Sequence, residues 1–450
     1  MKITFLDLYP DKKFKISKNT NSGLGTGNNY GNSLFAKLQN KLVKYGIHYP
    51  PQCCLYSMSV LKHQGHEIIY SDKLIENGSD LYIFTSSMVC HETEIKSISK
   101  LREKTDSYFL IIGPFLDHLH KPYIDADKKF LTKVILGEPE GFFYNNPDFF
   151  SQLDNFAEKI IYNELVNLDD LPYPSWDVVF KNSDKPKMVF MGKNNVSITL
   201  ETSRGCPYSC SFYCSYPNIQ GKKMRFRDPY KVIEEMLYHY KTIDARNFTI
   251  RDPVFSISKK HCNLILEEVA KINKPFNLCV ETHLKDIDDE TIQLMKKARV
   301  KLIYVGVESS DTEVLQSAKR KNISNLEIFQ KVKKLEAAGI MVKCNYILCL
   351  PADNYKTSIN TIKFAKKLNS SFAQFTVFTP MPRTPAWHDY EKKFTFKKYE
   401  QMTMWDLIFK HENINYEQLE ELKNKAAQYY FSPKYLVTRM PRVLYSIVNN

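Results

Sequence analysis

Three absences limit what this chain of 450 residues can be. It has no run of about 18 or more apolar residues, the length that a membrane-spanning helix needs. The first residues, MKITFLDLYPDKK, lack the apolar stretch and the small-residue cleavage site of a signal peptide. The usual zinc pattern of two Cys-x-x-Cys pairs is absent as well. Without a secretory signal, the ten cysteines predict reduced thiols or metal ligands in a cytoplasmic protein.

The charge of the chain is positive and dispersed. It has 63 Lys and Arg against 50 Asp and Glu, a net charge of +13. Such a charge attracts anionic partners, but no tract alternates arginine with aromatic residues as a nucleic-acid groove does. We therefore predict a solvated basic surface and no nucleic-acid partner.

Residues 1–150 alternate short apolar runs with amphipathic stretches. The apolar runs MKITFLDLY, DLYIFTSS, YFLIIGP and KVILGE predict strands of a doubly wound, Rossmann-like α/β sheet. Ligands of such sheets bind beyond the carboxyl ends of the strands. Those ends carry Asp7, Thr85, Ser86, Gly113 and Gly137. Residues 151–190 contain prolines and little periodicity, so we predict a linker there.

Residues 191–390 repeat the alternation more regularly. The predicted strands are VSITLE, NFTIR, NLCVET, LIYVGV, MVKCNYIL and AQFTVFT. Six βα units predict a partial (β/α)6 barrel of the TIM type, with its chemistry at the carboxyl ends of the strands. Two helix starts are predicted as well. Asp288 precedes an acidic first turn, and Ser310 stands in capping-box spacing with Glu313.

The last segment, residues 391–450, has a helical pattern rich in Tyr, Phe and Trp. We predict a helical tail whose aromatic residues pack onto the barrel, with a role in lining a substrate pocket as the alternative. The final stretch is amphipathic and basic, which is a weak indication of contact with a membrane surface.

Three of the ten cysteines, Cys206, Cys210 and Cys214, lie in the stretch TSRGCPYSCSFYCSYP, directly after VSITLE. Thiolates bind zinc or the iron of iron–sulfur clusters, and a structural zinc site needs a fourth protein ligand, which is missing nearby. Three thiols on one loop suit a 4Fe–4S cluster with one iron left open to a small molecule. Chance proximity, or zinc with a distant ligand, is the alternative.

The loop RGCPYSCSFYC resembles the cluster-binding loop of radical S-adenosylmethionine (radical SAM) enzymes, which usually read Cys-x-x-x-Cys-x-x-Cys. Further segments resemble this family in register: FTIRDPVFS, CVETHLKDID, YVGVESSDTEVL, LCLPADNYKTSINTIKFAKKLN and FTPMPRTPAW. The chain departs from the family in the last gap, where three residues separate Cys210 from Cys214. Either the loop absorbs the extra residue as a bulge or the cluster binds poorly.

The resemblance implies cofactors and their ligands. The three cysteines would hold the 4Fe–4S cluster, and S-adenosylmethionine (SAM) would bind its open iron. Asp252, Glu308 and Ser309 would contact SAM, although a carboxylate at a strand end can equally cap a helix or pair with a cation. An electron from a flavodoxin or ferredoxin would cleave SAM to methionine and a 5′-deoxyadenosyl radical, which removes a hydrogen atom from the substrate.

The N-terminal segments YPPQCCLYSMSVLKHQGHEIIYSD, IIGPF and ILGEPEGFF resemble the cobalamin-binding domain that precedes the barrel in one class of this family. This implies weak cobalamin contacts at Thr85, Ser86, Gly113 and Gly137. The D-x-H-x-x-G motif that would supply a histidine to cobalt is missing, and Ile112 stands where the family has glycine. The domain has therefore either retained its corrinoid or kept only the fold.

The catalytic residues stay unassigned. Weak candidates are Cys344 and Cys349 at the end of the fifth barrel strand, and His283 after the third. We predict a radical SAM enzyme that modifies an unactivated carbon of a metabolite or lipid, by cobalamin-dependent methyl transfer or ring formation. One alternative is an RNA-modifying methylthiotransferase, which the missing second set of cluster cysteines disfavours. The other is a non-catalytic corrinoid- or metal-binding protein with a damaged cluster loop.

Overall fold

The structure is a computed structural model, and it describes residues 1–449 except 12–13, 45–47, 128, 130–131, 154–158, 163–164, 183–184, 186–190, 192–194 and 322. The chain divides into two compact units. Unit 1 comprises Met1–Gly27, His48–Lys185 and Phe396–Thr403, and unit 2 comprises Asn28–Ile47, Pro186–Thr395 and Met404–Asn450. Each unit is thus assembled from three stretches of sequence, a feature absent from the predicted boundaries.

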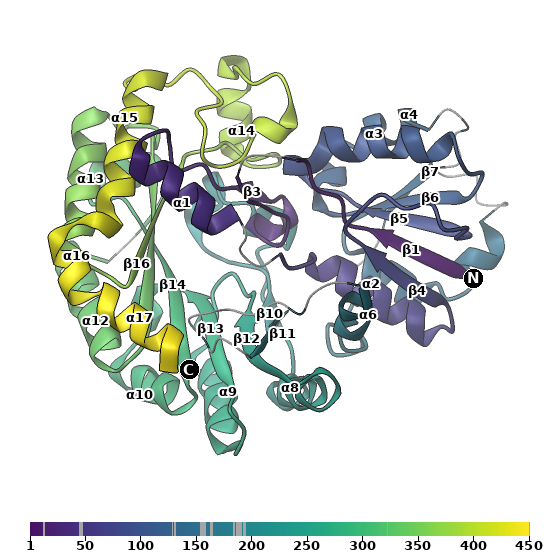
Figure 1. The fold of residues 1–450 in the computed structure, drawn as a ribbon, viewed down its shortest axis with the longest axis horizontal. Helices are drawn as coiled ribbons and strands as arrows, with labels where there is room; N and C mark the ends of the chain where they lie inside the picture. Colours follow the sequence, from purple (N-terminus) through teal and green to yellow (C-terminus); the bar gives the residue numbers. More distant parts are fainter. Residues whose placement is uncertain are drawn as a thin grey trace. The chain divides into compact units, whose positions relative to one another are not determined.

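Unit 1 is built on a parallel sheet in the order β4-β1-β5-β6-β7-β8 (Figure 1). Its strands are β1 (Lys2–Leu6), β4 (Glu67–Ser71), β5 (Leu81–Thr85), β6 (Tyr108–Ile112), β7 (Thr132–Leu136) and β8 (Ile160–Tyr162). β5 and β7 are buried along their whole length, as strands covered on both faces are. The strand order reverses at β1, which pairs with β4 on one side and β5 on the other. The β1/β5 gap is therefore the topological switch point, where such sheets bind ligands.

The helices of unit 1 are α2 (Gln52–His63), α3 (His91–Arg102), α4 (Lys121–Asp125), α5 (Pro139–Asn145) and α6 (Trp176–Asn182). The predicted linker belongs to this unit where the structure describes it. β8 extends the sheet beside β7, and Trp176 is fully buried. Within 151–190, residues 154–158, 163–164, 183–184 and 186–190 lie outside the described residues.

Unit 2 contains the predicted partial barrel. Its parallel strands are β9 (Val196–Leu200), β12 (Ala245–Ile250), β13 (Asn277–Thr282), β14 (Val300–Glu308), β15 (Met341–Leu348) and β16 (Phe372–Val377). They lie in the order β16-β15-β14-β13-β12-β9, which confirms all six predicted strands. The outer face is covered by α8 (Pro229–Ile243), α9 (Lys259–Lys271), α10 (Asp289–Lys297), α12 (Asn325–Ala337) and α13 (Tyr355–Leu368) (Figure 1). The sheet is open at β9 and β16, so it is a half-barrel.

One of the two predicted helix starts is confirmed and the other is wrong. The Asp288 carboxylate accepts a hydrogen bond from Thr291 N at 2.9 Å and caps α10. At α11 (Thr312–Ser317) the cap is Asp311, not Ser310, and its carboxylate accepts from Val314 N at 3.1 Å. The aspartate one residue later supplies the stronger acceptor, while the Ser310 hydroxyl lies 3.3 Å from the Thr361 hydroxyl.

The tail packs onto the half-barrel through α14 (Pro385–Tyr390), α15 (Tyr416–Ala427), α16 (Pro433–Thr438) and α17 (Met440–Asn449). The early helix α1 (Leu34–Lys44), purple in Figure 1, lies against α15, although the two are far apart in sequence. None of the helices in the described ranges combines the length and apolar character needed to cross a bilayer.

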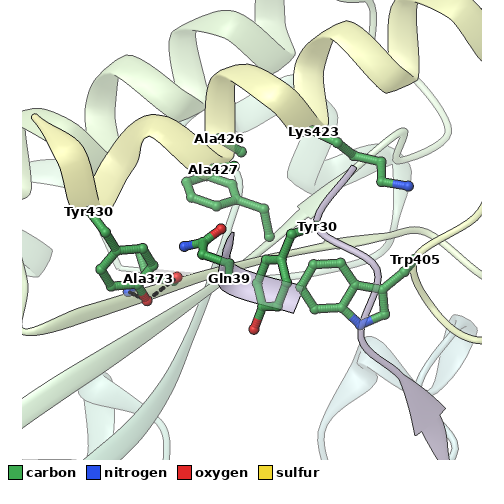
Figure 2. Close-up of a pocket in the computed structure, with 9 residues that line it drawn as sticks. Tyr30, Gln39, Ala373, Trp405, Lys423, Ala426, Ala427 and Tyr430 are labelled. Atoms are coloured by element: carbon green, nitrogen blue, oxygen red, sulfur yellow. Dashed lines mark hydrogen bonds between the residues drawn. The ribbon is translucent and has the colours of Figure 1, made fainter. Parts of the chain in front are cut away.

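A small hollow lies under this tail, partly open to solvent, and Figure 2 shows aromatic rings in its walls. The rings of Tyr30 and Trp405 meet edge to face with centroids 4.6 Å apart. The Tyr430 hydroxyl donates to the Ala373 carbonyl at 2.7 Å. The hollow contains none of the predicted site residues, which supports packing as the role of these aromatic side chains.

Candidate active site

The loop that follows β9 is fastened before its first cysteine. The buried Asp252 carboxylate accepts hydrogen bonds from Thr202 N and from the Ser203 hydroxyl, each at 2.7 Å. Burial raises the pKa of Asp252, and the hydrogen bonds from Thr202 and Ser203 oppose this shift. Just beyond, β10 (Ser203–Arg204) pairs antiparallel with β11 (Arg225–Phe226) and closes the intervening segment into a loop. Asp252 thus holds the start of the loop, and its contact with SAM stays a prediction.

Gly205 is required between this anchor and Cys206. Its φ is +98°, and a Cβ atom there would lie 2.3 Å from the Lys223 carbonyl oxygen. Any larger residue would clash with that backbone and strain its own. The close approach lets Cys206 N donate to the Gly221 carbonyl at 3.0 Å.

The three cysteines follow on the same loop. Cys206 and Cys210 are buried, and Cys214 is half-buried. Cys210 lies on the 3-10 turn η6 (Ser209–Phe212), and its carbonyl accepts from both Tyr213 N at 3.2 Å and Cys214 N at 3.0 Å. Whether the loop binds a cluster with this spacing stays a prediction. The Tyr213 ring packs against Phe378 with centroids 6.0 Å apart.

Arg320 supplies positive charge to this loop. Its Nη1 donates to Cys210 Sγ at 3.5 Å, and its Nη2 lies 3.4 Å from a Glu308 carboxylate oxygen. A hydrogen bond from Cys214, and then the charge of Arg320, lower the pKa of Cys210 to about 6. Cys210 therefore has the thiolate character that metal ligation needs. Sequence reasoning missed Arg320, which no motif marks and which lies 110 residues after Cys210.

Glu308 ends β14 with a left-handed φ of +65°. A Cβ atom at Gly306 would lie 2.3 Å from its carboxylate oxygen, which explains why glycine precedes it at this spacing. Burial raises the pKa of Glu308 to about 7, and Arg320 opposes the shift. Ser309 is turned inward, since its hydroxyl accepts from Asp311 N at 3.1 Å and lies 3.2 Å from the Thr361 hydroxyl.

The donor set fits an iron–sulfur cluster by chemistry. Within the described ranges, no group of three or more Cys, His, Asp or Glu side chains forms a ready-made metal cage. Metal sites are seldom complete before the metal binds, however. Three thiols on one fastened loop, with a guanidinium that promotes the thiolate, are ligands that iron–sulfur clusters take, and they leave one iron open.

The weak catalytic candidates are sealed. Burial raises the pKa of Cys344 to about 12 and raises that of Cys349. Cys344 lies on the helix-facing side of β15, where its neighbour Val342 N donates to Glu336 of α12 at 3.2 Å. His283 accepts from Lys285 N at 3.2 Å, and burial lowers its pKa to about 3. All three side chains are buried, and their part in catalysis stays a prediction.

The predicted cobalamin residues of unit 1 do not line an open crevice. Thr85 and Ser86 are fully buried, and a Cβ atom at Gly113 would lie 2.5 Å from the Ser86 carbonyl. Gly137 is exposed, and its N donates to the Asp117 carboxylate at 3.2 Å.

The chain itself fills the switch point of unit 1. The hairpin of β2 (Ile16–Ser17) and β3 (Thr26–Gly27) brings Lys18 there. Lys18 Nζ lies 3.1 Å from Asp7 and 2.9 Å from Glu94, and it donates to the Thr85 carbonyl at 2.7 Å. All three charged side chains are at most 1% exposed. With this lysine in place, the residues do not fit a corrinoid at this edge, and we derive no step through cobalamin.

A parallel half-barrel with three cysteines on the loop after its first strand defines the class of the protein: an α/β half-barrel with a cysteine loop at a strand end. Residues 200–365 match the radical SAM superfamily.

Two of the relatives carry names of methyltransferases. The chain is 28% identical over 278 residues to an uncharacterized methyltransferase of Pyrococcus horikoshii, covering 60% of this chain and 58% of that one. It is 25% identical over 224 residues to the bacteriochlorophyllide d C-8(2)-methyltransferase of Chlorobaculum tepidum, covering 48% and 49%. The chain thus spans about half the length of these curated relatives.

Solved structures share the fold. The structure of the radical SAM methyltransferase TsrM from Kitasatospora setae, with cobalamin and a 4Fe–4S cluster bound, matches 87% of this chain and 78% of that chain. The TM-score is 0.60 at 14% sequence identity, which shows similarity of fold.

Proposed function

We propose that the protein is a radical SAM enzyme that binds a 4Fe–4S cluster on Cys206, Cys210 and Cys214 and cleaves SAM reductively. The observation that carries the proposal is the cluster loop itself, with three thiols at the carboxyl end of β9 and Arg320 beside Cys210. When bound, the cluster supplies one electron to the sulfonium of SAM, from a donor such as a flavodoxin or ferredoxin.

Residues of the chain hold the cysteine loop in position and supply charge beside it. Asp252 and Gly205 hold the loop against the strand end. Arg320 keeps Cys210 ready to ligate iron and pairs with Glu308 at the end of β14. We expect the Glu308 carboxylate to contact SAM, and the room that Gly306 leaves it supports this role. Strand-end carboxylates and a buried cation give SAM a polar, partly water-excluded setting.

We include methyl transfer to an unactivated carbon in the proposal. The names of two relatives support methyl transfer as the reaction class, and the name of a further relative, a cyclase, supports ring formation. We assign no reaction step to cobalamin, because Lys18 fills the switch point of unit 1. The experiment below tests whether methyl transfer depends on cobalamin.

Anaerobic reconstitution tests this function. We expect about four irons and four sulfides per chain, and an EPR signal on reduction, from the wild type. Cys214→Ser should lose the signal, whereas Cys262→Ser, which changes a fully buried thiol on α9, should keep it. SAM should then yield 5′-deoxyadenosine, and S-adenosylhomocysteine measured with and without cobalamin reports methyl transfer. Folded wild-type protein without a reducible cluster would contradict the proposal.

A further inference from the structure

A layer of charged side chains crosses the inner face of the half-barrel. Glu281 of β13 is the register partner of Tyr304 on β14, and Tyr304 is the partner of Lys343 on β15. Thr249 of β12 pairs with Cys279, so Arg251, two residues further on, comes level with Glu281.

A group of buried hydrophobic residues earlier on the same strands shows which face of the sheet carries this layer. Cys279, Leu302 and Met341 lie two residues earlier on the same three strands and form one buried group with Met191. Because strand side chains alternate, the next residues of the same parity share that face. We call Arg251, Glu281, Tyr304 and Lys343 the lumen layer.

The charged members of the lumen layer are not paired with one another. Among the described residues, neither Arg251, Glu281 nor Lys343 has an ion-pair partner within 4.0 Å. The buried Nε of Arg251 has no hydrogen-bond partner. Asn345, two residues beyond Lys343, likewise has a buried amide oxygen without a partner. The Lys343 ammonium lies 5.1 Å from the centre of the Tyr304 ring.

Unpaired charge of this kind is poorly solvated in a folded protein. The side chains of Arg251, Glu281 and Lys343 are half-buried, and partial burial removes part of the hydration that a close partner would otherwise replace. Burial lowers the pKa of Lys343 to about 8, despite Cys279 and Glu281 opposing the shift, while Arg251 adds to it. Burial also raises the pKa of Glu281, which Arg251 and Lys343 oppose. Two cations and one carboxylate thus leave the layer one positive charge in excess.

We propose that the lumen layer binds the anionic group of the substrate, with carboxylate or phosphate oxygens held between Arg251 and Lys343. Glu281 and the Asn345 amide oxygen accept hydrogen bonds from hydroxyl or amino groups of the same molecule. The substrate is therefore a polar anion and not a hydrocarbon. This assignment rests on the proposed function, since it places the substrate two to four residues below Gly306 and Glu308 on the face of β14 that leads to the cluster loop.

Binding of inorganic phosphate and acetate to the full chain tests the proposal, by calorimetry at constant ionic strength in chloride. We expect Lys343→Met and Arg251→Gln each to raise the Kd of at least one anion about tenfold. The matched control is Lys301→Met, a half-buried lysine of opposite parity on β14, which should leave the Kd unchanged. Preference for phosphate or acetate then identifies the group on the substrate.

Equal affinities in wild type and Lys343→Met, or no anion binding by the wild type, would overturn the assignment. Circular dichroism of each variant excludes misfolding as the cause of a loss. Replacing a half-buried lysine that has no ion-pair partner among the described residues should leave the fold intact, since no partner charge is orphaned.

A second readout separates this inference from the proposed function. If the reconstituted wild type forms no cluster but retains Lys343-dependent anion binding, the function fails and the lumen site stands. If the wild type cleaves SAM and anion binding is independent of Lys343, only the lumen site fails.

Discussion

Both units place charged side chains on a parallel sheet, and they treat those charges in opposite ways. In unit 1, Lys18 lies within 3.1 Å of both Asp7 and Glu94, and the three side chains are almost fully buried. In unit 2, Arg251 and Lys343 have no ion-pair partner within 4.0 Å among the described residues. One set of charges is satisfied by the chain, and the other is left for a ligand.

The difference teaches how a strand-end charge should be interpreted. Ligands of parallel α/β folds bind at carboxyl ends, so charge there suggests a site in either unit. A charge that its own chain pairs and seals is structural, because binding a ligand would first have to break that pairing. A charge that stays unpaired marks a site, because the folded protein alone does not offset its lost hydration.

The largest expected effect is on the free energy of unfolding, and it should differ between substitutions of Lys18 and Lys343. Lys18→Met leaves Asp7 and Glu94 buried without their cation, so we expect the free energy of unfolding of unit 1 to fall by about 3–5 kcal/mol. Lys343→Met should be neutral or stabilising. Urea denaturation followed by circular dichroism measures both. Similar losses of unfolding free energy in the two variants would contradict the difference between the two units.

The next effect concerns the cluster loop. Deleting Tyr213 restores the usual Cys-x-x-x-Cys-x-x-Cys spacing but removes the ring that packs on Phe378. We expect iron content to be kept or to rise and the rate of 5′-deoxyadenosine formation to fall, because the extra residue shapes the site. A rise in both, measured by iron analysis and mass spectrometry, would instead mark the extra residue as damage.

The pH dependence of anion binding follows from Lys343. Its pKa in the folded protein is lowered to about 8, so the lysine loses its proton at a pH at which the unfolded chain still holds it. Anion affinity should therefore fall above pH 8, by about tenfold in all, which is the loss expected for Lys343→Met. Stability should rise in the same range, since the unfolded state then binds more protons. Phosphate titrations and unfolding at pH 7 to 10 check both trends, and both should vanish in Lys343→Met.

The smallest expected effect is the response of unit 1 to cobalamin. With Lys18 in the switch point, the wild type should show no saturable change in the visible spectrum of hydroxocobalamin. The matched sample is Lys18→Ala, which empties the position. A one-to-one spectral titration of the wild type would show that the hairpin yields to the corrinoid and that unit 1 is a ligand site after all.

The fold could largely be predicted from the sequence. The six barrel strands are apolar runs that sit between amphipathic helices, and each was recognisable on its own. Short or interrupted elements were not. The strand β8 has three residues and lies in a stretch with two prolines, and the hairpin of β2 and β3 has strands of two residues each. Such segments are held by tertiary contacts and carry no periodicity of their own.

The candidate site divides in the same way. Cys206, Cys210 and Cys214 were found because ligands on one loop are neighbours in sequence. Arg320 was not found, because it reaches Cys210 from 110 residues away. The sequence showed that Gly306 precedes Glu308 by two residues, as in the family pattern. Only the structure gives the reason, because the Glu308 carboxylate would collide with a Cβ atom at position 306.

By itself, the sequence determined the superfamily, the half-barrel and the cysteine loop, since each depends on residues close together in the chain. Only the tertiary structure decided which charges are paired. Asp7 meets Lys18 through a hairpin, and Arg251 comes level with Glu281 and Lys343 through strand register. Pairing depends on distances of a few ångströms between distant residues, and one sequence without its fold does not contain those distances.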